Sequence, residues 1–360
     1  MRYKNELIAA LLREIGLVNN FFPAASQSAG PVETIYFGGG TPSLCSNDEI
    51  RAILQQLKTY FTVVPEAEIT LEANPDDITE EKLIEWKHAG INRLSIGIQS
   101  FFEEDLAWMN RAHNSRQAWD SLVLATKYFD NITIDLIYGT PGLTDEKWKQ
   151  NVDRVVQLGI SHISCYALTV EPKTPLQKLI REHKAADVDP DQQSAQFLLL
   201  MQWLEEAGFE HYEISNFAKP GFRSRHNSSY WRGKPYFGFG PSAHSFDGAS
   251  RWWNIANNTS YIRSIGEDKI PFEKEELTPV QQVNEMIMIS LRTMEGLNTD
   301  RLIHEVKGMA TEEAMRMKQT VLEASARYIK TGLMVKEGEW LRLTKEGKLL
   351  ADGIAADLFF

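Results

Sequence analysis

The stretch that decides the fold is ETIYFGGGTPSLCSNDEI, residues 33–50, in which an apolar run ends at three glycines and a helical pattern begins soon after. The run ETIYF is typical of a buried strand, because β-branched and aromatic residues favour strands. The glycines (38–40) then place backbone without side chains at the strand's carboxyl end. Ser46 or Asn47 can cap the following helix. The stretch therefore predicts one βα unit with a ligand-approaching loop.

The three glycines leave two interpretations open. They can form a tight βα turn, or they can let a backbone with free N–H groups approach a ligand closely. One or two glycines usually suffice for a turn, and Thr41 and Pro42 already fix the exit of the chain. The loop lacks the lysine of a P-loop and the spacing of a GxGxxG motif. We therefore favour a ligand site other than a nucleotide-phosphate site.

The same order of elements recurs along the chain, because apolar β-branched runs alternate with segments of helical period. The runs are ETIYF from Glu33, EITLEAN from Glu68, RLSIGIQ from Arg93, NITIDLIYG from Asn131 and HISCYAL from His162. Two of the helical segments between them end at a glycine that can cap a helix, Gly90 and Gly159. A long helix over 192–207 leads to EHYEISNFA, the expected last strand. This alternation predicts a parallel sheet, either doubly wound or closed as a barrel.

The pattern changes after the last expected strand. Residues 218–258 are rich in glycine, aromatic and polar residues with little helix or strand period, which predicts a long functional loop. After Thr278 the sequence predicts three helices and a β-hairpin, the order of a winged-helix domain. We therefore expect a barrel core over 1–217, an aromatic and glycine-rich segment over 218–277, and a winged-helix-like domain over 278–360.

Composition excludes several classes of protein. The 360 residues are 43% hydrophobic and 24% charged, and no apolar stretch approaches the roughly 18 residues of a membrane span. The N-terminal segment MRYKNELIAALLREIG has no long apolar core or cleavage site, so we expect a cytoplasmic protein. The 2 cysteines rule out a disulfide framework. A net charge of −11 argues against a nucleic-acid partner, because phosphate binding needs clustered Lys and Arg.

Polar residues recur at the carboxyl ends of the predicted strands. Glu72 lies in LEANP, Gln99 in GIQS and Asp135 in the otherwise apolar ITIDLIYG, while Arg111 follows the third strand. A structural network inside a barrel is one explanation, because charged residues are rarely buried without partners. The carboxyl ends of the strands also form the active-site face of a βα barrel, where these side chains would converge. We therefore expect a polar binding site at that face.

These motifs together resemble the SAM-binding core of radical-SAM proteins related to oxygen-independent coproporphyrinogen III oxidase. GGGTP, the Glu of LEANP, GIQSF, the Arg of MNRAH, IDLIYGTPG and the YAL of SCYAL carry the resemblance, which spans nearly the whole chain. It implies an incomplete TIM-like (β/α) barrel with a C-terminal winged-helix domain, and S-adenosylmethionine (SAM) as cofactor. The residues that the resemblance assigns to SAM are Gly39, Gly40, Thr41, Glu72, Gln99, Arg111, Asp135 and Ala167.

Within this family, the segment after the last strand resembles the branch of heme chaperones, which carry an HNxxYW motif. The motif stands here at residues 226–231. The resemblance implies heme binding by His226, Tyr230 and Trp231, with the His226 imidazole on the iron and the aromatic rings over the porphyrin. A histidine satisfied by hydrogen bonds beside packed aromatic rings is the structural alternative.

The two cysteines and the histidines other than His226 supply few metal ligands. Family members carry a strand followed by CxxxCxxC, whose three thiolates hold a 4Fe–4S cluster, whereas Cys45 and Cys165 are too few for one. Cys45 is expected to be a loop or packing thiol and Cys165 a residue of the barrel. Because the SAM residues are intact, we expect an upstream truncation rather than a cluster-less relative. The cluster is thus implied only for the intact family form. His244 is the second candidate for the heme iron, and His113 and His211 are expected to be structural.

The resemblance implies a heme chaperone that binds heme and passes it to an acceptor protein, which the sequence does not identify. No catalytic residue is assigned. The alternative from the enzyme class is oxygen-independent coproporphyrinogen III oxidation, in which a 5′-deoxyadenosyl radical starts oxidative decarboxylation of propionates. The HNxxYW motif favours the chaperone. A winged-helix DNA-binding regulator is disfavoured, because the charges in that domain are mixed in sign.

Overall fold

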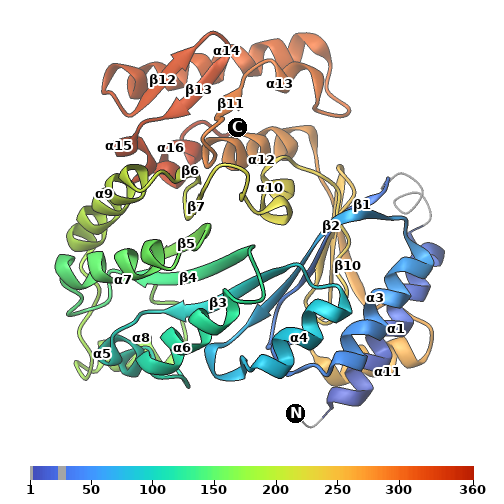
Figure 1. Ribbon diagram of the computed structural model, residues 1–360. Coiled ribbons are helices and arrows are strands. Elements are labelled where there is room, and N and C mark those ends of the chain that lie inside the picture. The colour runs from blue at the N-terminus through green and yellow to red at the C-terminus, as the bar shows by residue number, and fades with distance from the viewer. Residues whose placement is uncertain (1–2, 23–29) are drawn as a thin grey trace.

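A computed structural model describes residues 3–22 and 30–360. Its main sheet has seven strands: β1 (Val32–Phe37), β2 (Val63–Ala73), β3 (Arg93–Gln99), β4 (Ile132–Tyr138), β5 (His162–Ala167), β6 (Glu210–Glu213) and β7 (Asn216–Ala218). In the order β1-β2-β3-β4-β5-β7-β6 they curl into an open half-barrel (Figure 1). β1 to β5 are parallel, as the alternation of strands and helices predicts. The prediction of an incomplete TIM-like barrel is confirmed.

Helices connect the strands of the sheet (Figure 1). Ser46 and Glu49 form a capping box that begins one of them, and Gly90, at φ +107°, ends the next. The helices of this part are α1 (Lys4–Phe21), η1 (Pro42–Leu44), α3 (Asn47–Tyr60), η2 (Pro75–Asp77), α4 (Glu80–Ala89), α5 (Glu103–Trp108), α6 (Ser115–Ala125), α7 (Asp145–Gln157), α8 (Pro175–Arg181) and α9 (Pro190–Glu206). Several of them, such as α4, α6 and α7, cover the outer face of the sheet (Figure 1). Among the described residues, no helix has both the length and the apolar character needed to cross a membrane.

The two faces of the half-barrel differ in polarity, because successive side chains of a strand point to opposite faces. Residues such as Ile69, Leu94 and Ile134 belong to the main apolar core beneath the helices. The alternate positions are largely polar and line the inside of the curl: Thr34, Tyr36, Glu68, Thr70, Glu72, Arg93, Ser95, Thr133, Asp135, His162 and Ser164. The concave side of the sheet therefore presents hydrogen-bonding and charged groups.

The expected last strand, EHYEISNFA, is a hairpin of two strands, β6 and β7. The Glu213 carboxylate turns the chain, because it accepts hydrogen bonds from the Ser215 N–H at 3.1 Å and the Asn216 side-chain amide at 2.6 Å. β7 pairs antiparallel with both β5 and β6. The turn residues Ile214 and Ser215 include neither glycine nor proline, so the sequence carries no strong signal for the turn.

The segment predicted as a long loop instead contains regular elements. These are α10 (Arg225–Trp231), β8 (His244–Phe246) and β9 (Ser250–Asn254). α11 (Asn258–Gly266) and β10 (Phe272–Glu276) follow the predicted loop, and the three strands form an antiparallel sheet of order β10-β9-β8. The loop prediction was wrong because the elements are short and aromatic residues occupy both faces of the sheet, which hides their period. α10 lies inside the curl of the main sheet (Figure 1).

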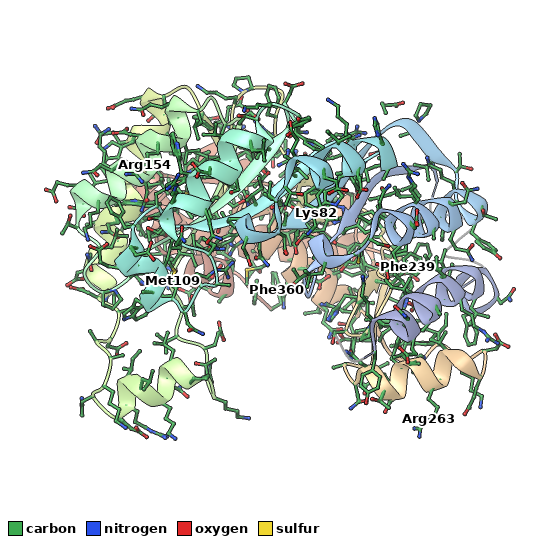
Figure 2. All side chains as sticks on the ribbon, turned by 60° about the horizontal axis from the view of Figure 1, so that its bottom comes forward. Lys82, Met109, Arg154, Phe239, Arg263 and Phe360 are labelled. Carbon is green, nitrogen blue, oxygen red and sulfur yellow. The ribbon has the colours of Figure 1, made fainter. Side chains whose placement is uncertain are left out.

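The three-stranded sheet and α11 attach to the barrel through α1. Trp252 of β9 stacks on Phe22 with ring centroids 4.4 Å apart, and Tyr261 of α11 packs in an apolar cluster with Ala10. The Tyr261 hydroxyl donates a hydrogen bond of 2.6 Å to the buried Glu14 of α1. Arg263, on the opposite side of α11, points away from the body of the molecule (Figure 2).

The C-terminal part has its own apolar core. Its elements are α12 (Pro279–Leu291), β11 (Leu297–Asn298), α13 (Arg301–His304), α14 (Thr311–Lys330), β12 (Met334–Glu337), β13 (Trp340–Leu343), α15 (Lys345–Lys348) and α16 (Ala351–Ala356). The Arg292 guanidinium pairs with the buried Glu213 carboxylate, with Nη2 and Oε1 3.2 Å apart. Lys348 Nζ lies 3.0 Å from His211 Nδ1. Both contacts join the C-terminal part to the β6–β7 hairpin. The winged-helix assignment and the three domain boundaries stay predictions.

Candidate functional site

The glycine loop lies directly after β1, at the carboxyl edge of the sheet. Gly39 and Gly40 have φ of +76° and +68°, which are left-handed conformations that favour glycine. A Cβ on either residue would meet no other described atom within 4 Å. The backbone is therefore open on that side to a ligand. Thr41 follows, and its carbonyl accepts the Leu44 N–H of η1 at 3.1 Å.

The carboxylate of Glu72, on β2, is fixed beside this loop. Its Oε1 accepts a hydrogen bond of 2.7 Å from the Tyr36 hydroxyl, and its Oε2 accepts one of 3.2 Å from the Gly39 N–H. Both oxygens therefore accept hydrogen bonds from β1 or the loop after it, and these bonds orient the carboxylate. A carboxylate in this position suits a cationic ligand group.

Asp135 lies near Glu72 on the inner face of β4. Burial, followed by the charge of Glu72, raises the pKa of Asp135 to about 7, whereas Ser164 and Arg111 act in the opposite direction. Below it, the buried Arg93 donates to the Asn131 and Thr133 side chains. On the inner face, the negative charge of Glu72 thus disfavours ionisation of Asp135. One charged and one more easily protonated carboxyl group suit a ligand with both cationic and hydroxyl groups.

Gln99 and Arg111 come from the end of β3 and the segment after α5. Gln99 has φ +65°, and the register of β3 with β4 shifts before it. A Cβ on Gly97 would lie 3.0 Å from Gln99 Nε2 and 3.5 Å from Arg111 Nη2, so this glycine makes room for both side chains. Arg111 Nη2 donates to Asn74 at 3.2 Å, and its buried Nε has no partner among the described residues. That orphaned N–H is available to an anionic group.

Ala167 ends β5 at the same edge, where its register partner is Tyr138 of β4. The structure brings Gly39, Glu72, Arg111 and Asp135 into hydrogen-bonded or electrostatic contact. Thr41 and Ala167 share the edge without hydrogen bonds to these four within the described part of the chain.

The HNxxYW motif forms α10, and Glu68 of β2 holds its first turn. The buried Glu68 carboxylate accepts hydrogen bonds from the backbone N–H groups of Arg225 at 3.1 Å and His226 at 2.9 Å. Carboxylates stabilise helix N-termini, because the first N–H groups there lack partners within the helix. The Ser224 hydroxyl caps the helix further by accepting the Asn227 N–H at 3.2 Å.

Both ring nitrogens of His226 have hydrogen-bond partners. Nδ1 lies 2.9 Å from the Thr34 hydroxyl and Nε2 lies 3.0 Å from the Tyr230 hydroxyl. The imidazole stacks on the Tyr36 ring with centroids 4.8 Å apart. Burial lowers the pKa of His226 to about 4, so the ring is neutral at pH 7. An iron atom could bind Nε2 only by replacing the Tyr230 hydroxyl.

The end of α10 contacts the C-terminal part. The Arg292 guanidinium lies over the Trp231 ring, 5.5 Å from its centroid, while it pairs with Glu213. The buried Nε1 of Trp231 has no hydrogen-bond partner among the described residues. The Trp231 ring is thus held by the Arg292 guanidinium, while its Nε1–H makes no hydrogen bond to a described residue.

Three further histidines considered from the sequence are His113, His211 and His244. His113 and His211 are held through their Nε2 atoms by the carbonyls of Ile98 at 3.1 Å and Ile214 at 2.9 Å, which fits structural roles. His244 is exposed on β8, and its ring lies beside Trp253 of β9 with centroids 5.9 Å apart.

The two cysteines do not form a cluster site. Cys165 is buried in the apolar core outside the sheet, where burial raises its thiol pKa, while Cys45 is partly buried after η1. Within 3–22 and 30–360, no group of three His, Cys, Asp or Glu side chains could hold a metal ion. The residues therefore do not fit a 4Fe–4S cluster, which needs three thiolates.

Two residues that organise the site were not predicted from the sequence, Tyr36 and Glu68, whereas Gly38 was expected only as part of the glycine loop. A signal for Glu68 was present, because Glu68 and Glu72 are four positions apart in EITLEAN and so face the same side of a strand. Tyr36 shares a face with Gly38 in the same way. Their partner α10 is far away in the sequence, so the pattern alone could not show what they contact.

Comparisons with known proteins show the family and the fold of the chain. A family model described as Radical SAM superfamily matches residues 20–155. The chain is 35% identical to a heme chaperone HemW of Mycobacterium tuberculosis (strain CDC 1551 / Oshkosh), over 93% of this chain and 83% of the relative. It is 33% identical to the heme chaperone HemW of Bacillus subtilis (strain 168), over 90% of this chain and 84% of the relative.

Among solved structures, coproporphyrinogen III oxidase (HemN) from Escherichia coli matches with a TM-score of 0.81 and 23% identity, over 100% of this chain and 84% of that chain. This likeness shows the fold. The identity with the HemW proteins over most of both chains shows the family. The chain belongs to the HemW family of radical-SAM proteins.

Proposed function

We propose that this protein is a heme chaperone, which binds heme and passes it to an acceptor protein. The observation that carries the proposal is the position of the HNxxYW motif, whose helix α10 is anchored inside the half-barrel by Glu68. The HemW relatives are named as heme chaperones, which supports it. We place the protein in the cytoplasm, with heme and an unidentified acceptor protein as partners.

In this proposal His226 is the iron ligand. Its imidazole is neutral at pH 7, as iron ligation requires, because burial lowers its pKa to about 4. Tyr230 is 39% exposed, and in this proposal its hydroxyl gives up Nε2 to the iron. The rings of Tyr230 and Trp231 would then cover a porphyrin face, and the free Nε1 of Trp231 could donate to a propionate.

The carboxyl edge of the sheet would bind SAM. Glu72 suits the ammonium, the orphaned Nε of Arg111 suits the carboxylate, and Asp135 suits the ribose hydroxyls. Gln99 adds a further amide donor. Gly39 and Gly40, with Thr41, let the methionyl end approach the backbone, and Ala167 borders the adenine. When bound, SAM would place a sulfonium, an ammonium, a carboxylate and ribose hydroxyls against these residues.

Hemin binding followed by transfer tests the proposal. The protein loaded with hemin is mixed with a heme-free globin, and the globin's Soret band is followed with time. The proposal expects stoichiometric hemin binding and transfer to the globin. Absence of hemin binding would contradict it. Conversion of coproporphyrinogen III to protoporphyrinogen IX would instead support the oxidase alternative.

A further inference from the structure

Tyr36 contacts both the residue proposed to bind SAM, Glu72, and the residue proposed to bind heme, His226. It is not itself assigned to either ligand. Its hydroxyl donates a hydrogen bond of 2.7 Å to Glu72 Oε1, at the edge proposed for SAM. Its ring stacks on the His226 imidazole with centroids 4.8 Å apart and planes inclined by 20°. One rigid side chain thus joins the carboxylate of β2 to the imidazole of α10.

The first glycine of GGGTP has a place in this arrangement. A Cβ on Gly38 would lie 2.6 Å from Cε1 of Tyr36 and 3.1 Å from Oε1 of Glu72. Any other residue would therefore push the phenol ring or break its hydrogen bond. Gly38 has no left-handed conformation, unlike Gly39 and Gly40, so its role is to make room for the Tyr36 ring rather than to turn the chain.

The other side of the imidazole is equally confined. Thr34 holds Nδ1, and the Tyr230 ring meets the imidazole edge-on with centroids 5.0 Å apart, contacts that do not need the Tyr230 hydroxyl on Nε2. His226 also lies in the turn held by Glu68. If the Tyr36 ring moves, the His226 imidazole must therefore move with it, because packed side chains shift together.

We propose that Tyr36 is a positioning residue that couples the SAM-facing carboxylate Glu72 to the imidazole of His226, so that SAM and heme affect each other's binding. This inference rests on the proposed function. A cation that binds Glu72 shares the carboxylate with the Tyr36 hydroxyl and so changes the hydrogen bond of this hydroxyl to Oε1, and the ring that carries the hydroxyl lies on His226. By linkage, the factor by which SAM changes heme affinity equals the factor by which heme changes SAM affinity.

Hemin and SAM titrations on the full chain test this coupling. The hemin dissociation constant is measured with and without saturating SAM, and the SAM dissociation constant with and without hemin. Wild type should show the same factor in both experiments, on the order of threefold or more. Tyr36→Phe keeps the ring on His226 and loses the hydroxyl, so it should still bind each ligand alone while the factor falls to about one.

Tyr60→Phe is the matched control, since Tyr60 is 40% exposed at the end of α3 and should leave the factor unchanged. Equal hemin affinities with and without SAM in wild type would overturn the inference, and so would an undiminished factor in Tyr36→Phe. Either result would leave hemin binding itself in place. A wild-type protein that fails to bind hemin would instead overturn the proposed function, so the two failures are distinguishable.

Discussion

The Glu68 carboxylate accepts the backbone N–H of His226 at 2.9 Å, although the two residues are 158 positions apart. This contact fixes where the HNxxYW helix lies, because Glu68 is on the inner face of β2, on the same side of the strand as Glu72. The strand that carries Glu72, the carboxylate proposed for SAM, is therefore also the strand that anchors the segment proposed for heme.

Glu68→Ala should destabilise α10. The substitution removes two charge-assisted hydrogen bonds from the helix N-terminus, and we expect a loss of about 2 kcal/mol in the free energy of unfolding, with faster amide exchange in α10. Urea denaturation and hydrogen exchange measure both quantities. Glu66→Ala, at an exposed position of the same strand, should change the free energy by no more than about 0.5 kcal/mol. Equal effects of the two substitutions would contradict the anchoring role.

Glu72→Ala and Asp135→Ala should each weaken SAM binding by about 1–3 kcal/mol, the loss expected when a buried hydrogen-bond partner is removed. Isothermal titration calorimetry measures this. Asp130→Ala is the control, because Asp130 is exposed just before β4, at the opposite edge of the sheet. Unchanged SAM affinity in both site variants would show that SAM binds elsewhere.

Asp135→Asn should make stability less dependent on pH. Burial and Glu72 raise the pKa of Asp135 to about 7, so the folded state holds this proton more tightly than the unfolded state. The resulting stabilisation is complete below about pH 4 and is lost as the pH rises through 7. Asparagine stays neutral, so the variant should be more stable than wild type at pH 8, by up to about 4 kcal/mol, with the difference shrinking toward pH 4. Urea denaturation showing a constant difference would refute this.

Tyr230→Phe should bind hemin more tightly. The substitution keeps the ring beside His226 and removes the hydroxyl that competes for Nε2, a net interaction of about 1 kcal/mol or roughly fivefold in affinity. Hemin titration followed at the Soret band measures the change. Tyr236→Phe, whose ring contacts Tyr230 but not His226 in the described contacts, should leave the affinity unchanged. Weaker binding by Tyr230→Phe would show that the hydroxyl assists the ligand instead of competing with it.

The sequence predicts the barrel well because β1 to β5 are long apolar runs with a helix after each. It does not predict the β6–β7 hairpin, since the turn depends on side-chain hydrogen bonds of Glu213 rather than on glycine or proline. Glu72 and Asp135 stand out because they are charged residues within apolar runs. Glu68 is also charged and shares a strand face with Glu72, but its role and that of Tyr36 depend on α10, which tertiary folding brings to them. The HNxxYW motif predicts His226 as a candidate heme ligand. Only the structure shows that both of its ring nitrogens already have hydrogen-bond partners, Thr34 and Tyr230.

The hemin complex of His226→Ala decides whether α10 supplies the iron ligand. If His226 ligates the iron, this variant should show a shifted Soret band and weaker hemin retention than wild type on a desalting column. His88→Ala, on the exposed side of α4, should match wild type in both respects. Identical spectra and retention for wild type and His226→Ala would contradict the assignment and direct attention to the exposed imidazole of His244.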